Sequence, residues 1–325
     1  MPVVVSDYSG CTWLPGGNLQ TIAPTLWFKR PKISYRRELW ETPDEDVIAV
    51  DFSQPEPRYE GAPVMVHFHG LEGSSESHYA QALMRKCADE GWRGLVVHYR
   101  SCGGVPSRVL KTYTAADGDE LDWVFQTVKK KWPSAPIFAM GVSLGANNLL
   151  CWAGSRQEDA SHYLNAMVAI CSPLDLEKSA TAIRSGLGPL YDLNFIRTMK
   201  TKILEKEKLF PKALDWEAVR GVRKVWEFDQ HVTAPLHGFR DALDYWAHCS
   251  SKRFIGGIKI PTLIINSCND PFTFTECFPQ SKDLPRSVIA EYPTQGGHCG
   301  FPTGAFPGSL GYLPNRTLRF CKEGR

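Results

Sequence analysis

The sequence predicts an α/β fold with a mostly parallel central sheet, helices on both faces of that sheet, and a helical insertion. Short apolar runs of strand length alternate with helical patterns along most of the 325 residues, which is typical of parallel strands joined by crossover helices. Between about residues 173 and 254 the strand signals stop, and a helical stretch rich in aromatic residues and lysine takes their place. We therefore expect a single domain over residues 1–325, with a cap inserted at about 173–254. Such a cap would cover the carboxyl ends of the strands, where ligands bind in open α/β sheets.

The predicted elements follow one another in the order that this fold requires. Residues 35–42 and 46–52 indicate an antiparallel hairpin at one edge of the sheet. The remaining strands are expected at 63–68, 94–99, 136–140, 166–171, 262–266 and 287–292. Helical patterns follow three of these strands, at 77–90, 115–132 and 144–154. Each such helix can cross over the sheet and lead into the next parallel strand.

Composition and charge indicate a globular protein that can bury a sizeable core. Hydrophobic residues make up 43% of the chain and charged residues 22%, and the formal net charge is +2. This charge argues against nucleic acid as a partner, which normally requires a concentrated basic face. No apolar run approaches the roughly 18 residues of a membrane-spanning helix, and residues 1–7 lack the pattern of a secretory signal. The ten cysteines include no Cys-x-x-Cys pair, so we expect reduced thiols in a cytoplasmic protein.

The most informative segment is 135–148, where an apolar run passes through Gly-x-Ser-x-Gly into a helical pattern. The five-residue pattern also occurs by chance, but a strand before it and a helix after it are the context of a nucleophile elbow. Such a turn leaves no room for side chains at Gly141 and Gly145, and it holds the Ser143 hydroxyl above the edge of the sheet. A serine hydroxyl needs a base to remove its proton during attack. Ser143 is therefore the candidate nucleophile, and an acid and a histidine should follow it in the chain.

Two backbone amides are candidates for stabilising the negative charge of an acyl-transfer intermediate. That charge appears only in the transition state, so its hydrogen-bond donors must already be in place. One donor is expected from Leu144, the residue after the nucleophile, and the other from the loop after the 63–68 strand. This loop contains HGLEG at 69–73, and Leu71 is the preferred second donor. An ordinary strand-to-helix turn is the alternative interpretation of the same loop.

Candidates for the acid and the base follow later strands. Asp270 comes at the carboxyl end of the 262–266 strand, and the proline after it prevents the strand from continuing. Asp175, after the 166–171 strand, is an alternative acid, although the position also suits a helix N-cap. His298 lies in a glycine-led loop after the last strand, and among nine histidines only His298 combines this position with the required chain order. The aspartate would hold the imidazole in the tautomer that can accept the serine proton.

These residues and several further motifs resemble the YheT-like branch of the α/β-hydrolase superfamily, a group of bacterial esterases related to mammalian α/β-hydrolase-domain lipases. The motifs extend over most of the chain: NLQT at 18–21, HGLEG at 69–73, RSCGG at 100–104, the elbow, EFD at 227–229, TA at 233–234, GF at 238–239, NDPF at 269–272 and GGHCGF at 296–301. The resemblance implies that Ser143, Asp270 and His298 form a catalytic triad. It also implies that the cap and residues 18–21 border an acyl pocket. The chain departs from the family at 310–325, where no strong amphipathic pattern supports a final helix.

We therefore expect a serine-dependent carboxylic ester hydrolase that acts through an acyl-enzyme on small to medium acyl esters, with no metal ion or organic cofactor. One alternative is a lipase or acyltransferase at a membrane surface. Residues 199–208 could then give the cap a peripheral lipid contact, although their mixed charges favour a plain exposed helix. A second alternative is a catalytically silent fold that binds a ligand. The sequence sets neither the acyl-chain length nor the oligomeric state.

Overall fold

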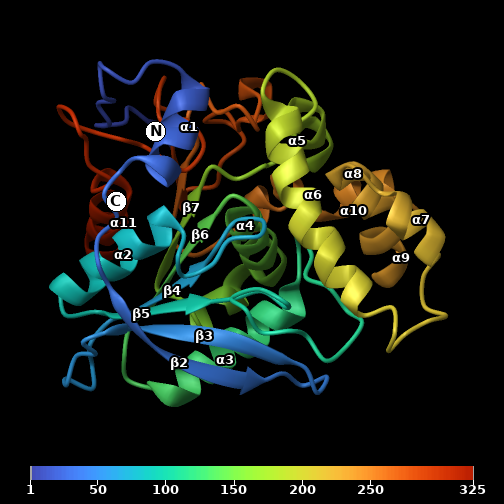
Figure 1. The fold of residues 1–325 in the computed structure, drawn as a ribbon. Coiled ribbons are helices and arrows are strands. Elements are labelled where there is room, and N and C mark those ends of the chain that lie inside the picture. Colours follow the sequence, from blue (N-terminus) through green and yellow to red (C-terminus); the bar gives the residue numbers. More distant parts are fainter. Residues whose placement is uncertain (1, 325) are drawn as a thin grey trace.

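The computed structural model describes residues 2–324 and contains a nine-stranded sheet (Figure 1). Its strands are β1 (Val3–Val4), β2 (Ser34–Glu41), β3 (Val47–Gln54), β4 (Val64–Phe68), β5 (Arg93–Val97), β6 (Ile137–Val142), β7 (Ala166–Ile170), β8 (Thr262–Ile265) and β9 (Val288–Glu291). The spatial order is β1-β9-β8-β7-β6-β4-β5-β3-β2. The β2–β3 and β3–β5 pairs are antiparallel, and all other neighbouring strands are parallel. The predicted sheet and its edge hairpin are confirmed, whereas the short strand β1 was not predicted.

Helices cover both faces of the sheet. Two helices, α2 (His78–Asp89) and α11 (Tyr312–Glu323), pack on one face, and α3 (Gly118–Lys131) and α4 (Leu144–Arg156) pack on the other. The strands supply both cores because successive side chains of a strand point to opposite faces. Along β4, for example, Val66 belongs to the core under α3 and α4, and its neighbour Met65 belongs to the core under α2 and α11.

The C-terminal segment forms a regular helix, contrary to the expectation from its sequence. Within α11, Leu318 and Phe320 are buried against the sheet. Arg316 lies buried in the same helix and pairs with Glu291 of β9 at 2.7 Å. The ion pair compensates the charge of an arginine on the buried face of the helix. Leu313, Phe320 and Cys321 recur at helical spacing on that face, an amphipathic pattern that the expectation from the sequence overlooked.

The segment between β7 and β8 is helical and gathers on one side of the molecule (Figure 1). Its α-helices are α5 (Leu176–Ala182), α6 (Gly188–Glu205), α7 (Trp216–Gly221), α8 (Val225–Phe228), α9 (Ala234–Leu236) and α10 (Ala242–Cys249). We call residues 173–254 the insertion. The expectation that residues 199–208 form a plain exposed helix is wrong for one face of that segment, because Met199, Ile203 and Lys206 are buried. Ile203 and Met199 belong to a small apolar core formed within the insertion.

No helix within residues 2–324 has both the length and the apolar character needed to cross a bilayer. All ten cysteines are free thiols, and nine of them are buried.

The N-terminal helix α1 (Gly17–Leu26) lies against the loops that follow β8 and β9, to which its side chains are hydrogen-bonded.

Candidate active site

Ser143 lies in a sharp turn between β6 and α4, where its backbone adopts φ 54° and ψ −117°. Positive φ is rare and strained for a residue other than glycine, and such residues persist only where the surrounding structure holds them in place. The Ser143 N–H donates to the Ile170 carbonyl of β7 at 2.8 Å. A Cβ atom at Gly141 would lie 2.3 Å from the Gly145 carbonyl oxygen, and one at Gly145 would lie 2.3 Å from the Phe68 carbonyl oxygen. Both glycines are therefore required by the close approach of backbone, as the elbow pattern predicts.

The loop that follows β4 lies beside the elbow, because β4 and β6 are neighbouring parallel strands. It forms a turn closed by a hydrogen bond of 3.0 Å from the Gly73 N–H to the Gly70 carbonyl. Leu71 from this turn and Leu144 from the start of α4 both lie in the wall of one cavity with Ser143. Within residues 2–324, neither the Leu71 N–H nor the Leu144 N–H donates a hydrogen bond to another residue. Both amides are thus available to a ligand in that cavity.

Asp270 and His298 are in direct contact. His298 Nδ1 donates to Asp270 Oδ2 at 2.7 Å, and the Asp270 side chain is fully buried. Asp270 Oδ1 accepts a second hydrogen bond from the Phe272 N–H at 2.8 Å. The Phe272 ring packs edge-on against the His298 ring, with centroids 4.5 Å apart. The alternative acid, Asp175, instead caps α5 by accepting a hydrogen bond from the Lys178 N–H at 3.1 Å.

Ser143 and His298 lie in the wall of the same cavity. No hydrogen bond joins their side chains in the described part of the chain. Nucleophile–base hydrogen bonds are often long in the absence of substrate and shorten when the substrate binds. Because Asp270 engages Nδ1, Nε2 is the nitrogen of His298 left for proton transfer.

Residues 18–21 lie behind the histidine rather than along the cavity, which corrects the expectation drawn from the family resemblance. Thr21 Oγ1 accepts a hydrogen bond from the His298 N–H at 2.8 Å. The buried Gln20 side chain accepts hydrogen bonds from the Asn269 Nδ2 at 3.0 Å and from the Gly296 N–H at 2.8 Å. Helix α1 therefore holds the loops that carry Asp270 and His298. The NLQT motif pointed to this segment, but only the tertiary contacts reveal its role.

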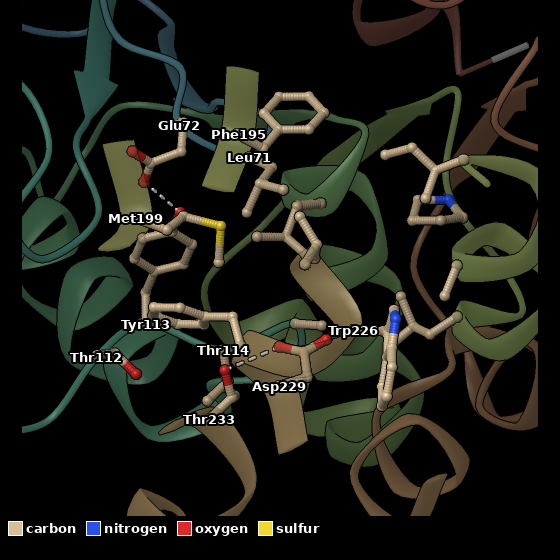
Figure 2. A pocket seen from close by; sticks show the side chains of 18 of the residues that line it. Leu71, Glu72, Thr112, Tyr113, Thr114, Phe195, Met199, Trp226, Asp229 and Thr233 are labelled. Carbon is tan, nitrogen blue, oxygen red and sulfur yellow. Dashed lines mark hydrogen bonds between the residues drawn. The ribbon is translucent and has the colours of Figure 1, made fainter. Parts of the chain in front are cut away.

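A cavity with a volume of about 170 Å³ lies over Ser143 and opens to solvent; Figure 2 shows part of its wall. The body of the protein contributes Leu71, Leu144, Phe272 and His298 to that wall. The insertion contributes much of its apolar surface, from residues Leu176, Ile183, Phe195, Met199, Val225 and Phe228. An apolar space with a few polar groups is typical of a site for a small organic ligand.

Sequence reasoning missed the acidic side chains in the cavity wall, among them Asp229 and Glu72 (Figure 2). Asp229 accepts hydrogen bonds from Thr233 Oγ1 and from Trp246 Nε1, each at 2.8 Å. Burial raises the pKa of Asp229 to about 6. Glu72 is also largely buried, and its carboxylate accepts a hydrogen bond from Tyr113 Oη at 2.7 Å. Both acids belong to motifs noted in the sequence, but a motif does not show whether its carboxylate is buried or faces a ligand.

Cys171, His298 and Cys299 have potential metal-ligand atoms within 4.8 Å of one another. Burial raises the pKa of both thiols above the usual range, so both stay protonated at neutral pH. Cys171 Sγ accepts a hydrogen bond from the Cys299 N–H at 3.3 Å, and His298 Nδ1 is engaged by Asp270. Protonated thiols are poor ligands, and this cluster is better explained as packing behind His298.

The family model of the alpha/beta hydrolase fold matches residues 63–305. The Escherichia coli (strain K12) protein "Putative esterase YheT" is 32% identical over 286 residues, covering 87% of this chain and 84% of that one. The protein "Phospholipase ABHD3" of Homo sapiens is 26% identical over 334 residues, covering 99% of this chain and 80% of that one. The Pyrococcus furiosus esterase Pf2001 has a similar fold, with a TM-score of 0.55 at 16% identity over 99% of this chain and 96% of that one. The chain therefore belongs to the α/β-hydrolase fold family, in the branch that contains Escherichia coli YheT.

Proposed function

We propose that the protein is a serine-dependent carboxylic ester hydrolase that acts through an acyl-enzyme on small to medium acyl esters. The observation that carries the proposal is the set of groups around one cavity. Ser143 is held at a strained turn beside two available amides, and the hydrogen-bonded Asp270–His298 pair shares that cavity. A nucleophile, a base oriented by an acid, and donors for an oxyanion are the parts that acyl transfer needs.

In the proposed reaction, Ser143 Oγ attacks the ester carbonyl while His298 Nε2 takes its proton. Asp270 holds the imidazole by its Nδ1–H and stabilises the imidazolium. The Leu71 and Leu144 amides donate to the oxyanion of the tetrahedral intermediate. When that intermediate collapses, the bond to the leaving alcohol breaks and His298 protonates the alcohol oxygen. A water deprotonated by His298 then attacks the acyl-enzyme and releases the acid.

We further propose that the insertion, residues 173–254, acts as a cap within a single domain and binds the acyl chain. Apolar insertion residues such as Phe195 and Met199 lie in the same cavity wall as Ser143. Burial of an alkyl chain against such side chains contributes about 0.8 kcal/mol per CH₂ group. A cytoplasmic location accords with the ten free cysteines, since thiols stay reduced there.

A lipase or acyltransferase at a membrane surface is the second candidate. The name of the human relative, a phospholipase, and the apolar wall of the cavity favour it. This candidate predicts faster turnover of an ester presented in phospholipid vesicles than of the same acyl group in a soluble ester. A lysolipid acceptor would then also compete with water for the acyl-enzyme, whereas a plain esterase would release only free acid.

Intact mass after exposure to a fluorophosphonate tests the proposal, with the wild type and Ser143→Ala compared side by side. Attack by Ser143 Oγ forms an O–P bond and expels fluoride, so the wild type should gain one adduct and the variant none. The variant should also lose ester turnover while keeping its melting temperature, because only a small hydroxyl is removed. An adduct that persists in Ser143→Ala would refute the assignment of the nucleophile. A folded wild type with no adduct would favour the silent, ligand-binding fold instead.

A further inference from the structure

Helix α6 of the insertion lines the cavity. It contacts both the loop that carries Asp270 and the turn that carries Leu71. Tyr191, Phe195, Met199 and Lys202 are spaced four, four and three residues apart, which places them on one face of the helix. Phe195, Met199 and Lys202 lie in the cavity wall, and Tyr191 packs edge-on against Phe272, with centroids 4.7 Å apart. The far end of this face, at Lys202, reaches the turn that carries Leu71.

At that end, Lys202 forms an ion pair with Glu72. Its Nζ donates to Glu72 Oε1 at 3.0 Å and lies 2.9 Å from Oε2. The Glu72 side chain is only 6% exposed, and Tyr113 Oη donates to the same Oε1 at 2.7 Å. Figure 2 shows Glu72, Tyr113 and Met199 together on one side of the cavity. A carboxylate this deeply buried requires a counter-ion and hydrogen bonds, and Lys202 supplies the charge from the insertion.

Glu72 also occupies an unusual place in its turn. Gly70–Gly73 is closed by the Gly73 N–H to Gly70 carbonyl bond, and Glu72 is its third residue, with φ 56°. This position normally favours glycine or asparagine, because a side chain at positive φ is strained. Such strain persists only when other contacts fix the residue, and here the side-chain carboxylate is fixed by Tyr113 and Lys202. These contacts restrain the turn directly after Leu71, which lines the cavity and whose N–H donates to no other residue within 2–324.

We propose that Glu72 and Lys202 are positioning residues that hold the Leu71 amide in place for the oxyanion, so that docking of α6 is a condition for catalysis. This inference rests on the proposed function. It differs from a substrate-binding role for the pair, because a positioning role acts on the chemical step for every ester. A pair that contacts substrate would change KM, and would do so for some esters and not for others.

The test measures kcat and KM with p-nitrophenyl acetate and butyrate, together with the rate of fluorophosphonate labelling and the melting temperature. The variants are Lys202→Met, Glu72→Gln and the two combined, with Lys202→Arg as the conservative rescue. Removing one oxyanion donor outright lowers kcat by about 10²–10³-fold, so a displaced donor should cost roughly 10- to 100-fold. We expect that loss in both single variants and for both esters, with KM changed less than about threefold and labelling slowed in parallel. The double variant should be no slower than Glu72→Gln, and Lys202→Arg should recover most of the rate.

Lys208→Met is the matched control, because it removes the same charge from an exposed lysine just beyond α6 and should leave kcat unchanged. If Lys202→Met fails to fold with Glu72 left unpaired, the double variant removes both charges and still tests the proposal. A folded Lys202→Met with wild-type kcat would overturn it, as would losses that multiply in the double variant or a change confined to KM. Absence of labelling in the wild type would overturn the proposed function itself, so the two failures can be told apart.

Discussion

Asp270→Asn probes the candidate triad most directly, because it changes one atom where Asp270 meets His298. Asp270 Oδ2 accepts the His298 Nδ1–H, and Oδ1 accepts the Phe272 N–H. Asparagine keeps one acceptor oxygen and gains an NH₂ donor. The Phe272 N–H can only donate, so it takes the oxygen and leaves the NH₂ group facing His298. The imidazole must then accept at Nδ1 and carry its proton on Nε2, and this tautomer cannot accept the serine proton.

The expected loss is large because the wrong tautomer stops general-base catalysis. The same change in a serine protease lowers kcat by about 10⁴-fold, which corresponds to roughly 5.4 kcal/mol of transition-state stabilisation. We expect a loss of similar size in kcat for p-nitrophenyl butyrate, with little change in KM. Melting followed by circular dichroism should show an intact fold, because asparagine has nearly the same volume and retains both hydrogen bonds.

Asp175→Asn is the matched control. Asp175 caps α5 through the Lys178 N–H, and asparagine is an equally good N-cap, so kcat should stay within about twofold of the wild type. The reasoning is wrong if a folded Asp270→Asn retains a tenth or more of the wild-type kcat. A large loss in Asp175→Asn would move the role of the acid to Asp175.

Thr21→Val removes the acceptor of the His298 N–H at 2.8 Å. The unsatisfied donor costs about 1–3 kcal/mol of stability, and the loop that carries His298 should shift to relieve that cost. A displaced base should lower kcat by about tenfold in steady-state kinetics, with KM nearly unchanged. Asp229, in turn, should make stability depend on pH, because burial raises its folded pKa from 3.8 to about 6. Between these values the folded protein binds a proton more tightly than the unfolded chain, so its unfolding free energy should rise, by up to ~3 kcal/mol, as the pH falls from 7 to about 4. Urea unfolding at pH 7, 6 and 5 should show this rise in the wild type relative to Asp229→Asn.

Both predictions have controls within the chain. The exposed Thr201 donates only to its own helix, at the Arg197 carbonyl, so Thr201→Val should leave kcat unaffected. Asp119 is 98% exposed, so Asp119→Asn should show the same pH dependence of stability as the wild type. An equal loss of kcat in both threonine variants would contradict the role given to α1. Parallel stability curves for the wild type and Asp229→Asn would contradict the raised pKa.

Much of the fold follows from local sequence patterns. The central strands β4 to β9 are fully or largely apolar runs, and the helices between them show a period of 3.6 residues, so both could be predicted without tertiary information. The absence of a final helix at 310–325 was a wrong expectation, because Leu313, Phe320 and Cys321 recur there at helical spacing. The local pattern does not reveal that the buried Arg316 of this helix is compensated by Glu291, which lies 25 positions away in the sequence.

The sequence by itself determined which serine lies at an elbow, and it limited the candidate acid and base to residues that follow strands at the same edge of the sheet. This was possible because an elbow is a local backbone structure with its own glycine requirement, and because parallel strands bring their carboxyl ends together. Only the tertiary structure decided that Asp270 and not Asp175 touches His298, and that Thr21 holds the histidine loop. It alone also placed Lys202 on Glu72, across 130 positions of sequence. The physical reason is that burial and ion pairing depend on how distant segments pack, whereas a turn depends on the residues within it.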